Sequence, residues 1–345
     1  PTGSQQAAAM AVARGPIFVN PFAPVGTAVG DAVDRTRGRI LRGGEATADS
    51  PVKLRLLTPS HARAEIITSA INTRFTREPG MVSETAAGES DESIRITVPI
   101  SWRRDPDAFM STLRHMTIRQ SNPESVAATI RRVVEQDPGY AGTAMARWHA
   151  LGTKALPVIR ELYDAPSRPV RTAALEAGAK LGDALVVPPL LEMIRDGSTD
   201  ARRDAVRLLR EPVEDPRIEF ALLERLSDED LEIRLAAYEG LNARNSLLLD
   251  RTVVGDGFIL DVVESDQPML YVAQVGQPRI VLFGSDLQLT DPMPAEVWSG
   301  RMILKEALDD AERVEIFYRP GRGAPAELYE SSRLVKDLIT RLGSD

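Results

Sequence analysis

The chain has 345 residues, of which 42 are Lys or Arg and 50 are Asp or Glu, so its formal net charge is −8. A chain of this sign lacks the excess of cations with which a general nucleic-acid binder displaces phosphate counterions, so we expect no nucleic-acid partner. The sequence has no cysteine, which excludes disulfides, thiolate nucleophiles and Cys-ligated metal sites. No apolar run is long enough to span a bilayer.

The first 50 residues differ from the rest in composition. They are rich in Gly, Ala and small polar residues, and Pro16, Pro21 and Pro24 interrupt them. This pattern predicts extended chain and loop, with one short edge strand at residues 17–19. Because the chain begins at Pro1 rather than Met, we expect a processed or truncated product whose signal peptide is no longer present.

Residues 51–120 alternate between strand and helix patterns. Apolar residues recur with period two in two stretches and at helical spacing in two others, and Pro59 and Pro106 mark the helix starts. The expected elements in order are a strand at 52–57, a helix at 60–75, a polar loop at 78–92, a strand at 93–98 and a helix from 105. This segment is predicted to be a small β-α-β-α unit.

Residues 121–246 are almost entirely helical in pattern and contain an internal repeat. Arg171, Arg202 and Arg234 occupy equivalent places in three copies, 31 and 32 residues apart, and another apolar helix precedes each copy. Each unit is a helix, a turn containing Asp and a second helix, which resembles a HEAT repeat. We expect an α-solenoid of about four HEAT-like helix pairs, since one pair cannot bury its apolar face alone. The three arginines are expected to bind neighbouring turn aspartates or carbonyls rather than a ligand.

Residues 247–345 are predicted to form a β-rich domain with a terminal helix. Turns containing Pro and Gly separate the apolar stretches. The expected elements are strands at 258–263, 269–275, 279–284, 287–289, 301–305 and 314–318, followed by a helix at 328–342. The chain is thus expected to be an α+β multidomain protein divided into residues 1–50, 51–120, 121–246 and 247–345.

The sequence shows no motif for catalysis or cofactor binding. It lacks a phosphate-binding loop, a dinucleotide fingerprint, a zinc-protease motif and a nucleophile elbow. His61, His115 and His149 are far apart in the sequence, so surface or capping roles are expected rather than a metal site. We therefore predict no catalytic residue, no cofactor and no metal, and a protein that is not an enzyme. An enzyme built on helical repeats would need convergent carboxylates or histidines in a pocket.

A group of arginines in the repeats is the candidate partner-binding site. Arg202, Arg203, Arg207 and Arg210 make a basic stripe on one predicted helix of an acidic protein. One interpretation is a solvated face whose arginines pair with neighbouring acids. The other is a contact surface for an acidic partner.

Two separate stretches carry motifs in an informative order. The first, over about 90 residues, combines the turn Gly38-Arg39-Ile40 to Gly44, the strand end Thr58-Pro59, the helix signature Ala70-Ile71-Asn72, the strand end Val98-Pro99 and the helix pair Ala108-Phe109. The second is residues 278–289, where a strand ends in Gly284 and another follows. Together they resemble the C-terminal part of the flagellar basal-body P-ring protein family. This sequence departs from the family because helical repeats lie between the two stretches and the family's Gly-rich front portion is missing.

The resemblance implies a structural, non-catalytic subunit of the ring around the flagellar rod, located in the periplasm. Its expected partners are further copies of itself in a ring and rod or L-ring proteins, with the HEAT-like insertion contacting another component. The alternative is a HEAT-repeat protein-binding scaffold unrelated to the flagellum.

Overall fold

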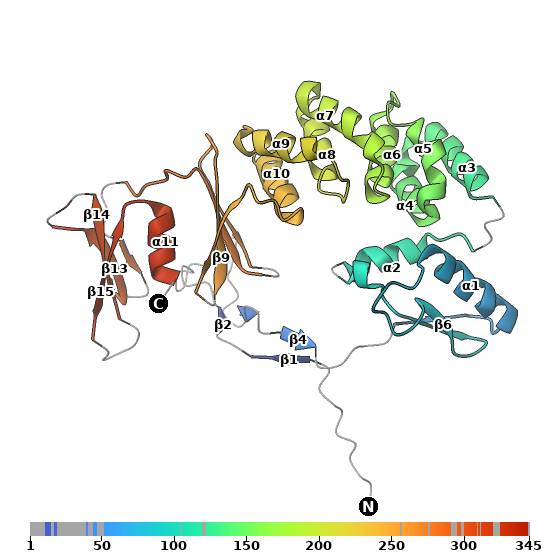
Figure 1. Ribbon diagram of the computed structural model, residues 1–345, viewed down its shortest axis with the longest axis horizontal. Helices are drawn as coiled ribbons and strands as arrows, with labels where there is room; N and C mark the ends of the chain where they lie inside the picture. The colour runs from blue at the N-terminus through green and yellow to red at the C-terminus, as the bar shows by residue number, and fades with distance from the viewer. Residues whose placement is uncertain are drawn as a thin grey trace, which may run out of the picture. The chain divides into compact units, whose positions relative to one another are not determined.

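The protein is α+β, with a helical repeat region and a β-rich C-terminal part that ends in a helix, as expected from the sequence (Figure 1). A computed structural model provides the structure. It separates into two compact units, Pro1–Asp49 with Leu247–Asp345, and Ser50–Ser246. The predicted domain boundaries stay predictions, and residues 51–120 and 121–246 lie together in the second unit. The structure describes residues 11–14, 17–18, 39–40, 44–46, 52–103, 105–118, 122–255, 257–274, 277–290, 295–297, 300–308, 310, 312–319 and 325–343.

The unit Ser50–Ser246 begins with a small antiparallel sheet covered by helices. Its strands are β5 (Val52–Arg55), β6 (Ala86–Gly88) and β7 (Ser93–Ile96), in the order β5-β7-β6. The helices are α1 (His61–Arg74) and α2 (Pro106–Arg114), with a 3₁₀ turn, η1 (Ile100–Trp102), before α2. Ser60 and Asp105 accept hydrogen bonds from the first turns of α1 and α2, which explains where each helix begins. The core consists of Leu56, Ala64, Ile71, Phe75, Ala86, Ile94, Ile96 and Phe109.

The predicted loop at 78–92 contains strand β6, which the sequence pattern missed. Ala86 and Gly88 have small side chains, so the strand shows no β-branched alternation. The side-chain amide of Asn72 in α1 holds the strand in place despite its low β-propensity. It donates to the Ala86 carbonyl at 3.0 Å and accepts from the Ala86 N–H at 2.8 Å. The hydroxyl of Thr85, the residue before β6, donates to the carbonyl of Phe75 at 2.9 Å and so anchors the start of the strand. Hydrogen bonds from α1, rather than local propensity, therefore hold this strand.

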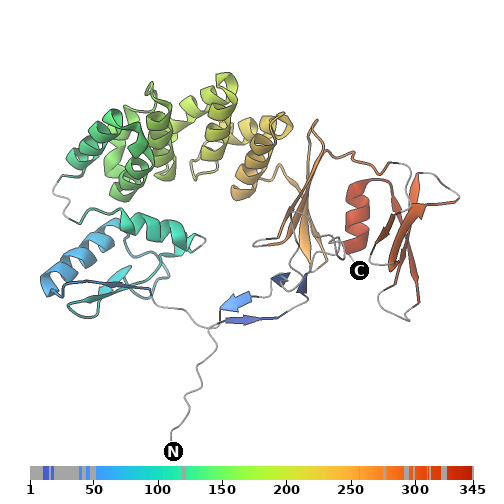
Figure 2. The ribbon, with the colours of Figure 1, turned by 180° about the vertical axis from the view of Figure 1, so that it is seen from behind.

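Residues 122–246 form four stacked helix pairs, as the repeat predicted (Figure 1). The second helices of the pairs contact one another in the order α4, α6, α8 and α10, and α3 contacts α5 while α7 contacts α9. Figure 2 shows the paired green and yellow helices from the opposite side. The helices are α3 (Pro123–Gln136), α4 (Ala141–Leu151), α5 (Leu156–Arg160), α6 (Arg168–Lys180), α7 (Val187–Asp196), α8 (Thr199–Leu208), α9 (Pro216–Glu224) and α10 (Leu231–Ala243), with 3₁₀ turns η2 (Pro138–Tyr140), η3 (Gly152–Ala155), η4 (Ala184–Val186) and η5 (Arg225–Ser227).

Small residues let the helices of the repeats approach closely. Ala174, Ala205 and Ala237 are fully buried at equivalent places in successive second helices. Gly178 packs so tightly that a β-carbon there would lie 2.0 Å from the hydroxyl of Tyr163. Larger apolar side chains fill the remaining space, and each fully buried leucine contributes about 1.5–3 kcal/mol. Stacking of neighbouring pairs thus supplies the core that one pair lacks.

Two of the three repeated arginines make the structural contacts expected of them. Arg234 donates to the carbonyls of Asp228 and Glu229 at 2.7 and 3.1 Å. Arg202 lies 3.8 Å from the Asp228 carboxylate. The Nε of Arg171 is buried without a hydrogen-bond partner among the residues that the structure describes.

The C-terminal part of the other unit consists of two four-stranded sheets and a helix between them (Figure 1). The first sheet has the order β10-β11-β9-β8, with β9 and β11 parallel, and the second is antiparallel with the order β12-β13-β14-β15. Helix α11 (Val335–Gly343) packs Val335 and Ile339 on the first sheet and Leu338 on the second. The strands are β8 (Asp250–Val254), β9 (Phe258–Val263), β10 (Met269–Ala273), β11 (Arg279–Phe283), β12 (Ala295–Val297), β13 (Met302–Glu306), β14 (Arg313–Tyr318) and β15 (Glu327–Ser332).

Three predictions for residues 247–345 need correction. The helix expected at 328–342 begins only at Val335, because residues 327–332 form β15 and pair with β14. Residues 287–289 make an isolated bridge between Gln288 and Leu334 rather than a strand. Strands β8 and β12 were not expected, because they are edge strands with weak apolar alternation.

The first 50 residues contain short strands where mostly loop was predicted. Strand β1 (Ala11–Ala13) pairs with β4 (Gly44–Ala46), and β2 (Ile17–Phe18) pairs with β3 (Arg39–Ile40). Strand β2 is the edge strand expected at 17–19. Strands of two or three residues are too short for periodicity to reveal. The prolines at 16, 21 and 24, and Gly38 of the predicted turn, lie outside the described residues.

Candidate functional site

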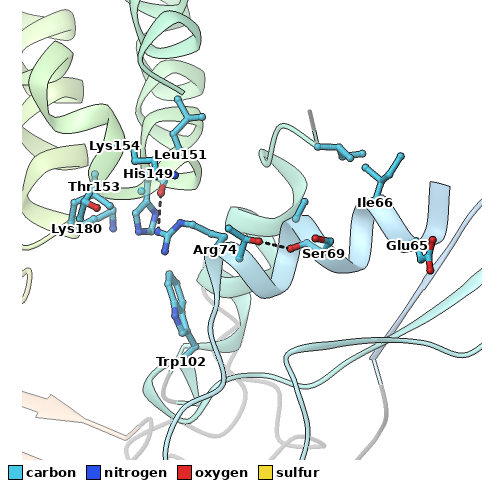
Figure 3. A pocket seen from close by; sticks show the side chains of 15 residues that line it. Glu65, Ile66, Ser69, Arg74, Trp102, His149, Leu151, Thr153, Lys154 and Lys180 are labelled. Carbon is cyan, nitrogen blue, oxygen red and sulfur yellow. Dashed lines mark hydrogen bonds between the residues drawn. The ribbon is translucent and has the colours of Figure 1, made fainter. Parts of the chain in front are cut away.

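A basic cleft of about 950 Å³ lies within the unit Ser50–Ser246. Helix α1 forms one wall, and the C-terminal ends of α4 and α6 with η3 form the other (Figure 3). One end of the cleft is lined by the positively charged side chains of Arg74, Lys154 and Lys180, and Trp102 lies beside them. These residues come from four separate elements, so only the folded chain assembles the site.

Arg74 is the central cation of the cleft. Its Nε donates to the carbonyl of Ala150 at 3.1 Å, and its Nη2 donates to the carbonyl of His149 at 3.0 Å. Both carbonyls belong to the last turn of α4, and the carbonyl of His149 also accepts from the backbone N–H of Gly152. Desolvation by burial lowers the pKa of Arg74 from its usual value, but an arginine at neutral pH keeps its charge.

Gly152 makes the close approach of Arg74 possible. It follows α4 with a φ of +75°, and a β-carbon built there would lie 3.1 Å from the Nε of Arg74. A side chain at this position would therefore strain the backbone and displace the guanidinium. The turn after α4 and the arginine from α1 fit together because residue 152 is glycine.

His149 is buried behind the cations. Its ring lies 5.7 Å from that of Trp102, and its Nδ1 lies 3.5 Å from the Oγ1 of Thr112. Burial lowers the pKa of His149 to about 4, and the charges of Arg74 and Lys180 act in the same direction. The imidazole is therefore neutral near pH 7, and the electrostatic potential at this end of the cleft is positive.

The two lysines of the cleft differ in their partners. Lys180 binds Glu211 at 2.9 Å and lies 3.9 Å from Glu176. Lys154, in η3, is exposed and has no ion-pair or hydrogen-bond partner within the described part of the chain. Glu65 lines the opposite end of the cleft, about 13 Å from Arg74 along α1 at 1.5 Å per residue.

This arrangement is suited to binding rather than to proton transfer. The cations and the neutral His149 can attract and hold an anion, and among the described residues no carboxylate forms a hydrogen bond or ion pair with His149. Within the described ranges, no group of three His, Asp or Glu side chains is placed to hold a metal ion. No helix among the described residues is long and apolar enough to cross a membrane.

The arginines predicted as a partner-binding stripe lie on α8 and just after it. Two of them connect α8 to α10. Arg203 pairs with Asp230, donating from Nε at 3.1 Å, and lies 3.3 Å from Glu232. Arg210 lies 3.3 Å from Glu239. The hydrogen bond between Arg203 and Asp230 raises the pKa of the arginine and lowers the pKa of the carboxyl.

The other two arginines of the stripe make longer contacts. Arg207, one turn after Arg203, lies 3.7 Å from Asp204 of its own helix. Arg202 points to the following turn, where it lies 3.8 Å from Asp228. Arg202 and Arg203 therefore both reach the turn before α10, while Arg207 pairs within α8 and Arg210, just after α8, lies near Glu239. A role of these residues in partner binding stays a prediction.

Sequence reasoning missed the cleft because its parts are remote in the chain. Arg74 and Ala150 are 76 residues apart, and nothing local in the sequence joins them. One local signal, which the sequence analysis did not use, is Gly152 directly after a helical pattern, a position typical of a helix end. His149 was noted in the sequence, and the structure places it in the wall of this cleft.

Comparison with known proteins supports the repeats. Residues 135–210 match the family model for HEAT repeats, which confirms the HEAT-like prediction for the helical repeats. No curated protein matches the chain. A similar solved structure is the complex of CpcE and CpcF of phycocyanin lyase from Nostoc sp. PCC7120, at 22% identity and a TM-score of 0.31. The match covers 36% of this chain and 80% of that chain. At this TM-score the likeness assigns no activity here.

Two predictions from the sequence change with these findings. The prediction that the protein is not an enzyme is withdrawn, because a similar solved structure belongs to a lyase, although that likeness assigns no activity to this chain. None of the three comparisons supports the resemblance to the flagellar P-ring family.

Proposed function

We propose that the protein is a HEAT-repeat scaffold that binds a partner protein through its helical repeats. The observation that carries this proposal is the stack of four helix pairs, of which residues 135–210 match HEAT repeats. Each pair contacts its neighbours, so the second helices α4, α6, α8 and α10 form a continuous row. Stacks of this kind present extended surfaces that bind other proteins.

The exposed arginines of α8 are the proposed contact. The side chains of Arg207 and Arg210 are 62% and 58% exposed, and their ion pairs are 3.7 and 3.3 Å long. Exposed ion pairs of this kind contribute about 0–1 kcal/mol to stability. A carboxylate of an acidic partner can therefore replace the intramolecular carboxylates beside Arg207 and Arg210 at little cost in free energy. Arg203 is held by Asp230 and is assigned a structural role.

Charge reversal on α8 tests the proposal. A photo-crosslinking residue at the exposed position 214 of the full chain, just after α8, identifies the partner, and the affinity of that partner is then measured for Arg207→Glu with Arg210→Glu. The control is Arg195→Glu on α7, whose side chain is also exposed and pairs with its neighbour Asp196. We expect the α8 variant to lose at least ten-fold in affinity and the control to bind as the wild type does. Equal binding by all three proteins would contradict the proposal.

The flagellar ring subunit implied by the sequence resemblance is a separate proposal, together with its periplasmic location and its rod or L-ring partners. It is supported by the resemblance and by the elements β5, α1, β7 and α2, which follow the order of the motifs in residues 52–118 with the additional strand β6 between α1 and β7. Electron microscopy of the full-length protein tests it, because head-to-tail contacts that close would give rings. A monodisperse monomer that never forms rings would count against it.

A further inference from the structure

We propose that the basic cleft binds a small organic anion, whose carboxylate or phosphate lies against Arg74 and Lys154. The site is separate from the arginines of α8, and the proposal does not depend on the scaffold function. It rests on the charge of the cleft, on the partners of its cations and on the apolar side chains that line the rest of it.

The first argument is that Arg74 carries a partly buried charge without a counterion. Its Nε and Nη2 bind neutral carbonyls, and no carboxylate pairs with it among the described residues. Its Nη1 has no hydrogen-bond partner in the same part of the chain. A desolvated charge without an opposite charge is costly, so an anion that reaches Nη1 gains a favourable interaction.

The second argument is that the net charge at this end of the cleft is positive. The C-terminal ends of α4 and α6 together carry about one negative elementary charge from their dipoles. Arg74 and Lys154 supply two positive charges, while Lys180 is neutralised by Glu211. A surplus of about one positive charge remains. Burial is the main cause of the lowered pKa of His149, and the positive charge of Arg74 acts in the same direction.

The third argument concerns the body of the ligand. A volume of about 950 Å³ is within the range of small-molecule sites. Trp102, Leu151 and Ile66 line the cleft with apolar surface beyond the cations. Glu65 at the far end repels a second anionic group. The ligand that fits is therefore singly anionic at one end, with an apolar or aromatic body.

Calorimetric titration of the full chain with benzoate, phenyl phosphate and inorganic phosphate tests the proposal. We expect benzoate or phenyl phosphate to bind more tightly than inorganic phosphate, and the tighter of the two identifies the oxyanion. The absence of binding by both aromatic probes would overturn the proposal. Binding of inorganic phosphate as tightly as phenyl phosphate would overturn the assignment of an apolar body.

Variants locate the site. Lys154→Gln removes an exposed lysine without structural partners, so the fold is expected to survive, and we expect affinity to fall about ten-fold. Lys53→Gln is the control, because Lys53 is also an exposed lysine but lies on β5, outside the cleft, and pairs with Glu89.

Glu65→Gln, at the opposite end of the cleft, is expected to improve the affinity for a dianion such as terephthalate. Unchanged affinity in Lys154→Gln, or an equal loss in Lys53→Gln, would place the binding elsewhere and overturn the proposal.

Discussion

The guanidinium of Arg74 is hydrogen-bonded to the carbonyl of Ala150 at 3.1 Å, across 76 residues of sequence. This bond ties the end of α1 to the end of α4, so the small sheet with its helices contacts the helical repeats there as well as through α2. The same arginine stacks over the ring of Phe75, 4.9 Å from its centroid. One side chain therefore joins the core of the small sheet, the first repeat and the basic cleft.

Gly152→Ala tests how tightly this junction is packed. The positive φ and the approach of Arg74 predict a loss of about 1–3 kcal/mol in the free energy of unfolding. The matched control is Gly142→Ala in α4, where a β-carbon meets no atom within 4 Å. That change is expected to be neutral or to stabilise by up to about 1 kcal/mol. Equal effects of the two variants in urea unfolding would contradict the packing described for Gly152.

Asp183 is predicted to be the main buried anion of the repeats. It accepts two hydrogen bonds from Arg160, at 2.9 and 3.0 Å, and one from Tyr163 at 2.8 Å. Burial alone raises the pKa of Asp183, but these bonds outweigh it and lower the pKa below its usual value. Asp183→Ala is expected to cost about 2–4 kcal/mol, since it leaves Tyr163 and Arg160 without their acceptor. Tyr163→Phe, which removes one bond, is expected to cost about 1 kcal/mol.

The same carboxylate predicts a dependence on pH. Because the pKa of Asp183 is lowered by folding, its stabilisation is present above the unfolded pKa and is lost as the pH falls through the folded value. Urea unfolding at a series of acidic pH values should therefore show a smaller decline for Asp183→Ala than for the wild type below about pH 4. Parallel curves would show that Asp183 does not titrate as described.

His149 predicts a second pH dependence at milder acidity. Its pKa is about 4 in the folded protein and 6.5 in an unperturbed side chain. Below about pH 6.5 the imidazole of His149 is therefore protonated in the unfolded chain. In the folded chain it is protonated only below about pH 4. The protein is expected to lose about 3 kcal/mol over this range, at 1.36 kcal/mol per unit. His149→Gln should remove this slope, and a slope that persists would contradict the burial of a neutral imidazole.

A buried charge cluster in the first C-terminal sheet gives a further prediction. Asp261 on β9 is fully buried and binds Arg251 on β8 at 2.7 and 2.9 Å, with Arg279 on β11 at 3.6 Å. Asp261→Asn is expected to destabilise this unit by about 3–5 kcal/mol, because two arginines would lose their shared anion. The control is Glu315→Gln on β14, whose partner Lys305 is partly exposed, and we expect less than about 1 kcal/mol there. A small effect at Asp261 in urea unfolding would contradict the importance of the cluster.

Periodicity predicted the helical repeats well because each helix buries one regular stripe. The copies around Arg171, Arg202 and Arg234 became α6, α8 and α10. Strand β6 and the start of α11 were missed for a different reason. Asn72 holds β6 through side-chain hydrogen bonds, and pairing with β14 converts the start of the predicted terminal helix into β15. Tertiary contacts override local pattern at such places.

The candidate sites also divide into one that a local sequence pattern reveals and one that only tertiary contacts create. The arginines of α8 were found in the sequence because they share one helix. The acids that pair with Arg203 and Arg210 are the N-cap of α10 and a residue of that helix, about 30 residues later, and were not assigned to them. The cleft depends on α1, η1, η3 and α6, which no single window of sequence contains. Its only advance signals were Gly152 at a helix end and a histidine in an apolar pattern.

Hydrogen exchange of the full chain with its crosslinked partner, compared with the unbound chain, tests most directly whether the repeats are the binding surface. We expect slowed exchange in α8 and in the neighbouring second helices α6 and α10, with no change in β8 to β15. Protection confined to β8 to β15, with α6, α8 and α10 exchanging as in the unbound chain, would contradict a scaffold that binds through its helical repeats.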